Sequence, residues 1–123
     1  MDAFTSQLGP QQGRLIKDDG QAIFVLGAET PGWRADLAVG DFVEVVQDAD
    51  LTDVKLVRVR GELEVRSVPS HMAWEATLLV DGVSQASIRG RPGVVRPIRD
   101  LAACVVGLQG VHAVAVRLSL VGV

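Results

Sequence analysis

The chain has 123 residues, of which 12 are Lys or Arg and 15 are Asp or Glu, so its formal net charge is -3 at pH 7. This length suits one domain with a substantial core. The acidic balance argues against a nucleic-acid binder that depends on phosphate contacts. Because 48% of the residues are hydrophobic, we expect part of the apolar surface to face a partner subunit.

The single cysteine excludes an intrachain disulfide, which suits folding in a reducing cytoplasm. Cys104 lies in the apolar segment Leu-Ala-Ala-Cys-Val-Val, which predicts a small buried side chain rather than a nucleophile. The first residues carry neither the basic nor the long apolar segment of a signal peptide, and no apolar stretch is long enough to span a membrane. We therefore expect cytoplasmic synthesis without a signal peptide and no membrane partner.

Residues 1–13 are polar and contain Gly9, Pro10 and Gly13, so we expect an N-terminal arm, followed by one domain over residues 14–123. Two short strands are predicted on either side of Asp18-Asp19-Gly20, which is typical of a hairpin turn. A loop is expected over residues 27–40. A strand then covers 41–47, and a polar bend covers 48–53.

The clearest pattern is the alternation from Leu56 to Arg66, in which apolar and charged side chains occupy opposite parities. Such a period of two predicts a strand with one buried and one solvated face, in an antiparallel sheet that covers a core. Val54 and Leu56 lie on the other parity from Val57 and Val59. We therefore expect the strand to start at Val54 and to contain a β-bulge near Leu56 or Val57.

The second half of the chain continues the strand pattern. After a turn at 67–72, residues 73–80 form a strand in which Trp74 anchors the core. Asp81-Gly82 predicts a hairpin to an edge strand at 83–89. A short strand at 94–98 and a final strand at 111–121 flank residues 100–106, which suit one helical turn or an irregular crossover. The sequence therefore predicts an all-β fold, an antiparallel β-sandwich of about eight strands.

The segment from 74 to 121 resembles the closing part of jelly-roll sandwich modules. Its elements are the strand Val95 to Ile98, the turn Asp100-Leu101-Ala102-Ala103, a loop bounded by Gly107 and Gly110, and a final apolar strand. Galactose-binding-like modules and accessory β-sandwiches of bacteriophage virions and tails share this arrangement. The resemblance implies a jelly-roll-like fold and a binding or structural role.

Four arginines lie within a short segment, and they form the first group of candidate residues. An arginine side chain matches carboxylate and phosphate groups, so the segment could contact an acidic partner or another subunit. Ion pairs with neighbouring acids such as Asp100 are the simpler interpretation. The candidate interface residues are the arm's Phe4 and Leu8 together with Arg89, Arg91, Arg96 and Arg99.

A second group of candidates could form a ligand loop. Trp33 lies in the long loop, and Asp48, Asp50 and Asp53 occupy the polar bend. The acids lack the central Gly and terminal Glu of a calcium loop, so solvated turn residues are the better interpretation. His71 and His112 share no metal-ligand spacing, which favours a structural role for His112.

No nucleophile elbow, phosphate-binding loop or metal-ligand set is present in the sequence, so we expect neither an enzyme nor a cofactor. The first hypothesis is a non-enzymatic structural protein that assembles with copies of itself and with neighbouring structural proteins, such as a phage virion or tail component. The alternative is a carbohydrate- or receptor-binding module, with a glycan as ligand. No nucleic-acid partner is expected.

Overall fold

The computed structural model describes residues 13–26, 33–36, 42–66, 72–91, 94, 96–98 and 100–122, and these residues form ten strands and no helix. The strands are β1 (Gly13–Asp18), β2 (Gln21–Leu26), β3 (Trp33–Asp36), β4 (Phe42–Asp50), β5 (Leu56–Arg66), β6 (Met72–Val80), β7 (Val83–Gly90), β8 (Arg96–Ile98), β9 (Ala102–Cys104) and β10 (Val111–Gly122). The all-β prediction is confirmed. Among these residues, no segment could cross a membrane as a helix.

Four strands form a wholly antiparallel sheet in the order β4-β10-β6-β7. The long strand β10 is its centre, since it pairs with β4 on one side and β6 on the other. The Asp-Gly turn connects β6 to β7, which is an edge strand as predicted. A bulge interrupts the β6–β7 ladder between Leu78 and Leu79.

The second sheet has six strands and is organised around β5. β2 and β3 run parallel to β5, whereas β8 and β9 run antiparallel to it. Only a short segment separates β8 from β9, so both follow one edge of β5. Leu63 pairs with Trp33 of β3 and with Arg96 of β8, which places β3 on the opposite edge. The wholly antiparallel expectation is therefore wrong for this sheet.

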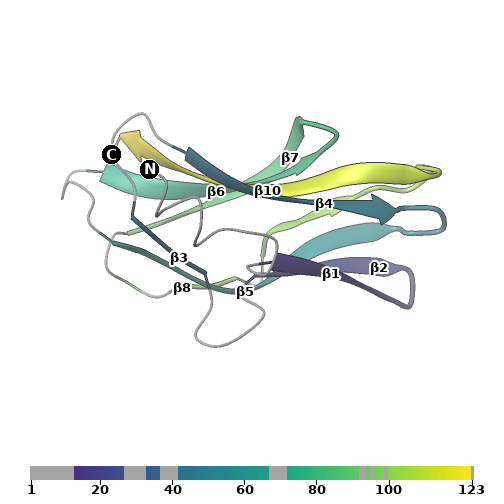
Figure 1. Ribbon diagram of the computed structural model, residues 1–123, viewed down its shortest axis with the longest axis horizontal. Helices are drawn as coiled ribbons and strands as arrows, with labels where there is room; N and C mark the ends of the chain where they lie inside the picture. Colours follow the sequence, from purple (N-terminus) through teal and green to yellow (C-terminus); the bar gives the residue numbers. More distant parts are fainter. Residues whose placement is uncertain are drawn as a thin grey trace.

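The two sheets lie as stacked layers, which Figure 1 shows almost edge-on. Alternate residues from both layers meet in one apolar cluster, because side chains in a strand point to opposite faces in turn. From β5, Val57 and Val59 are 0% and 1% exposed, whereas Arg60 is exposed, as the alternation predicted. The described residues include no buried polar or charged residue, so hydrophobic burial stabilises this core.

Trp74 is the largest fully buried side chain, which confirms its predicted place in the core. Its cross-strand partner is Gly90 of β7. The indole lies where a side chain on residue 90 would be, because a Cβ built on Gly90 would be 2.0 Å from Trp74 Cζ2. The indole Nε1 donates a hydrogen bond to the Arg91 carbonyl at 3.1 Å. Trp74 thus packs over Gly90 of the edge strand β7 and hydrogen-bonds to the main chain of the next residue, Arg91.

Several boundaries differ from the sequence-based expectations. β3 lies inside the expected loop at 27–40, and β9 lies in the segment 100–106, for which the sequence suits one helical turn or an irregular crossover; the described residues therefore form more than the expected eight strands. β5 begins at Leu56 instead of Val54. Val54 lies in the β4–β5 connection, before β5 begins, and its side chain is buried. The change of parity between Val54 and Val57 therefore needs no bulge at Leu56 or Val57.

Cys104 is exposed, which corrects the prediction that it is buried. In β9, Ala103 points into the core, so the adjacent Cys104 must point outward. Residues 1–12, which contain most of the expected arm with Phe4 and Leu8, lie outside the described residues, as do Arg99, His71 and the turn at 67–71.

Candidate functional site

Four connections between strands meet at one end of the molecule. They are the β1–β2 turn, the β4–β5 connection at 51–55, the β6–β7 turn and the β9–β10 loop at 105–110. Lys55 N donates to the Gly20 carbonyl at 2.8 Å, and Val105 N donates to the Lys55 carbonyl at 3.0 Å. Leu51 N donates to the Gly110 carbonyl at 2.9 Å. These backbone bonds join turns from both sheets into one surface, which we call the turn end.

Both hairpins at the turn end have the predicted Asp-Gly chemistry. Asp19 and Gly20 have φ values of 47° and 80°, and Asp81 and Gly82 have values of 51° and 77°. Two consecutive residues with positive φ give a turn whose twist matches that of the flanking strands. Asp tolerates this conformation better than most residues. The Asp81 side chain is thereby held beside the start of β10.

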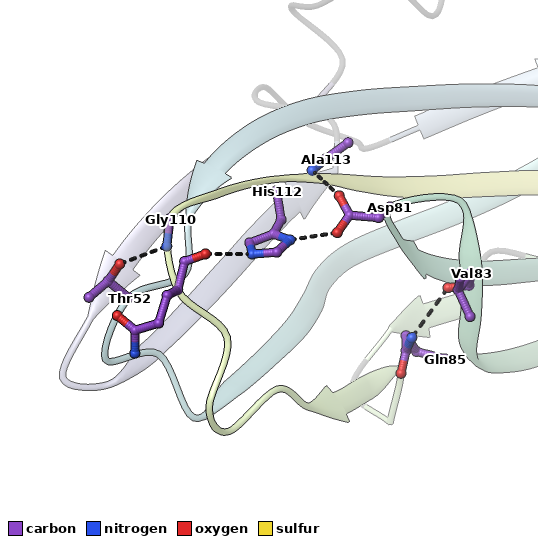
Figure 2. A network of polar contacts seen from close by, with 8 residues as sticks. Thr52, Asp81, Val83, Gln85, Gly110, His112 and Ala113 are labelled. Carbon is purple, nitrogen blue, oxygen red and sulfur yellow. Dashed lines mark hydrogen bonds and ion pairs between the residues drawn. The ribbon is translucent and has the colours of Figure 1, made fainter.

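His112 and Asp81 form the most connected polar pair at this end (Figure 2). His112 Nδ1 lies 2.5 Å from Asp81 Oδ2, and His112 Nε2 lies 2.8 Å from the Gln109 carbonyl oxygen. The other carboxylate oxygen of Asp81 accepts a hydrogen bond from Ala113 N at 3.0 Å. The pair therefore connects the β6–β7 turn, the β9–β10 loop and β10.

A protonated histidine satisfies this geometry fully, because both ring nitrogens face oxygen atoms that accept hydrogen bonds. A neutral imidazole has one N–H and could satisfy only one of them. The hydrogen bond to Asp81 is the main cause that raises the pKa of His112 above its ordinary value of 6.5, and the Gln109 carbonyl adds to it. The same hydrogen bond lowers the pKa of Asp81 below 3.8.

Both ring nitrogens of His112 have hydrogen-bond partners within the chain. A general base needs a free ring nitrogen within reach of the proton that it removes. In His112, the nitrogen opposite Asp81 is bound to the main chain of Gln109. The pair therefore fastens two connections together, which agrees with the structural role expected for His112.

Asp50 and Thr52 form a second set of hydrogen bonds, which joins the end of β4 to the β9–β10 loop. Thr52 N donates to Asp50 Oδ1 at 2.9 Å, and Thr52 Oγ1 accepts a hydrogen bond from Gly110 N at 2.9 Å. The hydrogen bonds from Thr52 lower the pKa of Asp50 below 3.8. The carboxylate thus organises the connection after β4.

A shallow open cleft of about 200 Å³ lies between the β4–β5 connection and the β9–β10 loop. Its walls carry one acid and one amine, Asp53 and Lys55. The remaining lining residues are Val54, Val106, Gly107, Leu108 and Gln109.

Two of the four arginines of the expected interface group, Arg89 and Arg96, lie side by side. Arg96 donates to the Arg89 carbonyl at 3.2 Å, so these two residues are adjacent. Each forms an ion pair with a nearby acid, Arg96 with Asp100 at 3.1 Å and Arg89 with Glu75 at 3.0 Å. These contacts agree with the simpler interpretation, in which the arginines neutralise neighbouring carboxylates.

The expected ligand group is divided between distant places. Asp48 and Asp50 belong to β4, so the predicted polar bend is in fact the end of a strand, and only Asp53 lies in the connection after it. The backbone of Trp33 pairs with Leu63, seven positions after the start of β5. At about 3.3 Å per residue this is roughly 23 Å from the turn end. One site cannot combine Trp33 with these acids.

The link between His112 and Asp81 was not expected from the sequence, although the turn role of Asp81 was. The two residues are separated by a long segment, and they meet only because β10 lies beside β6. Ala113 forms backbone and side-chain hydrogen bonds with Asp81, which continue the β10–β6 ladder into the turn. The Asp-Gly turn was the sole local signal for this site.

The outer face of the four-stranded sheet is the other candidate surface. Val46, Ala115 and Leu79 lie in register across β4, β10 and β6, and their side chains point away from the shared core. Ala115 and Leu79 are 6% and 4% exposed, whereas Val46 is 49% exposed. We call these three residues the apolar row.

Charged and aromatic groups border the apolar row. Arg117 forms an ion pair with Glu44 at 2.7 Å, and its guanidinium lies 4.8 Å from the centre of the Phe42 ring. The ring itself is 57% exposed. The edge of the sheet along β4 therefore presents two exposed apolar side chains, Phe42 and Val46, on either side of the Glu44–Arg117 ion pair.

Comparison with known proteins gives no relative: no protein-family model, no curated protein and no solved structure matches this chain.

Proposed function

We propose that this protein is a non-enzymatic structural subunit that assembles with copies of itself and with neighbouring structural proteins. The observation that supports this proposal is a pair of exposed apolar side chains on the outer face of the edge strand β4, Phe42 and Val46, which are 57% and 49% exposed. The outer face of an antiparallel sheet in a lone domain is normally polar. An exposed aromatic ring and an exposed valine on that face are typical of a surface that another subunit covers.

The fold that we propose for this role is a β-sandwich related to jelly-roll accessory domains. Two stacked layers and a chain that crosses repeatedly between them support this relationship. The parallel neighbours of β5 depart from a purely antiparallel jelly roll. A component of a phage virion or tail is the specific role that we propose, because such particles use small β-sandwich subunits in many copies.

The experiment measures the molar mass in solution. Analytical ultracentrifugation at micromolar concentrations should give a mass above the 13.1 kDa of one chain. Val46→Lys would place a charge in the apolar row and should reduce that mass to the monomer value. Val106→Lys is the matched control, because Val106 is 73% exposed in the β9–β10 loop and lies away from the apolar row.

Two results would refute the proposal. One is a wild-type protein that remains monomeric over the whole concentration range. The other is an oligomer that Val46→Lys and Val106→Lys affect equally, because the apolar row would then not be the covered surface. Circular dichroism spectra of both variants would establish that they fold.

A further inference from the structure

Two glycines bound a short segment of the β9–β10 loop. Gly107 and Gly110 have φ values of 90° and 78°, in the left-handed region that glycine adopts without strain. They lie on either side of Leu108 and Gln109. Gly107, Leu108 and Gln109 also line the cleft at the turn end. A change in this segment would therefore change one wall of the cleft.

The two ends of the segment are fastened differently. Gly110 is bound through its N–H to Thr52 and through its carbonyl to Leu51, and neither bond involves a group that titrates near neutral pH. Leu108 N donates a longer bond, 3.3 Å, to the Val105 carbonyl. Gln109 is fastened through its carbonyl to His112 Nε2. One contact on the cleft wall thus depends on the protonation of a histidine.

We propose that His112 is a proton-operated clamp that, as an imidazolium, ties the β9–β10 loop to the β6–β7 turn and, on losing its proton, releases Gln109 and loosens the cleft wall. The argument rests on two acceptor oxygens facing the two ring nitrogens. It does not depend on the proposed assembly, and neither proposal requires the other.

The structure also indicates which contact breaks. A neutral imidazole keeps one proton, and a charged carboxylate is a stronger acceptor than a main-chain carbonyl. The remaining N–H should therefore stay on Nδ1 and keep its hydrogen bond to Asp81. The unprotonated Nε2 and the Gln109 carbonyl oxygen would then both be acceptors, so the hydrogen bond between them would be lost. Deprotonation consequently acts on the loop and leaves the β6–β7 turn attached.

Two carboxylates near His112 favour its charged form. Asp81 contacts the ring directly from the β6–β7 turn, and Asp50 contributes at longer range from the end of β4. Partial burial of the ring opposes them, and the net effect raises the pKa of His112 above 6.5. The β9–β10 loop contributes its neutral Gln109 carbonyl, and the β4–β5 connection contributes the neutral Thr52. The clamp should thus be closed below about pH 6.5 and should open as the pH rises through the raised pKa of His112.

The experiment combines two NMR measurements on the full chain. Side-chain spectra of His112 across pH 5 to 9 should show loss of the Nε2 proton with retention of the Nδ1 proton. Hydrogen exchange of the Leu108 amide, corrected for its intrinsic pH dependence, should accelerate on the order of tenfold over the same titration, since a charge-assisted hydrogen bond is lost. The Val116 amide, at the centre of β10, is the internal control.

Two variants make the test specific. His112→Gln should give the fast Leu108 exchange at every pH. Asp81→Asn keeps an oxygen for Ala113 N but removes the charge, so it should move both the His112 titration and the Leu108 transition to lower pH together. The proposal would be overturned if the corrected exchange rate of the Leu108 amide did not change across the His112 titration. It would also be overturned if His112→Gln showed the same pH dependence of that rate as the wild type.

Discussion

The contact between Gly90 and Trp74 gives the sharpest prediction for stability. The φ angle of Gly90 is not in the left-handed region, so its backbone could accept an alanine. Without a neighbouring obstacle, Gly→Ala in a strand should stabilise a protein by roughly 0.5 to 1 kcal/mol. The position of the Trp74 indole predicts the opposite sign.

The size of the effect follows from the distances. A Cβ on residue 90 would lie 2.0, 2.3 and 2.7 Å from three indole carbons, whereas carbon atoms prefer separations of about 3.5 to 4.0 Å. The indole would have to move by about 1.5 Å inside a packed core. Overpacking of this kind costs about 1 to 3 kcal/mol. Weakening the Trp74 hydrogen bond to Arg91 adds about 1 kcal/mol.

Gly90→Ala should therefore lower the free energy of unfolding by about 3 kcal/mol. For a chain of this length, the entropy of unfolding is about 0.26 kcal/mol/K, so Tm should fall by about 12 °C. Urea denaturation and thermal unfolding, both followed by circular dichroism, measure the two quantities. In a Trp74→Phe background, the loss of unfolding free energy caused by Gly90→Ala should be smaller by at least about 1 kcal/mol. Coupling energies of about this size are typical of residues in contact.

Gly82→Ala is the matched control. Its Cβ would meet no atom within 4 Å, but its φ of 77° is unfavourable for alanine, so the expected loss is only about 1 kcal/mol. A Gly90→Ala variant as stable as the wild type would refute the reasoning. So would additive effects of Gly90→Ala and Trp74→Phe, because the indole would then not be the obstacle.

The other predictions concern the turn end and the surface. The stabilising effect of the His112–Asp81 pair should be greatest between about pH 4 and 6.5: the Asp81 contribution is lost as pH falls through its lowered pKa, and the His112 contribution is lost as pH rises through its raised pKa. Urea denaturation of wild type and His112→Gln across pH measures this difference, and a difference independent of pH would contradict it. Cys104 should react with a thiol reagent in the native protein within minutes; a reaction that requires denaturant would contradict its exposure. Arg117→Ala should cost about 1 kcal/mol or less, because its ion pair with Glu44 is partly solvated; a much larger loss would show that the pair is effectively buried.

Local patterns in the sequence predicted most of the strands. The alternation over Leu56 to Arg66 and the apolar face of β6 indicate strands because neighbouring side chains point to opposite faces. The two Asp-Gly turns were recognised because their residue types tolerate positive φ. Short elements were harder to predict: β3 and β9 are too short to show a period of two, and their pairing with β5 stabilises them.

Part of the candidate surface was also predictable. The arginine segment was correctly associated with an ion pair to Asp100, because the two residues are close in sequence. The grouping of Trp33 with the acids failed, because sequence distance between loops says little about their separation across a sheet. The burial expected for Cys104 failed for a related reason, since an apolar segment in an edge-like strand still has one outward face.

The sequence by itself determined the all-β class, the main strands and the turns, because these depend on residues within a few positions of one another. The tertiary structure decided which strands are neighbours, and with that the parallel pairs of β5, the contact of Trp74 with Gly90 and the apolar row. It also brought His112 to Asp81. These features join residues that lie far apart in the chain, and their contact depends on the order and register of the strands, which local side-chain patterns do not encode.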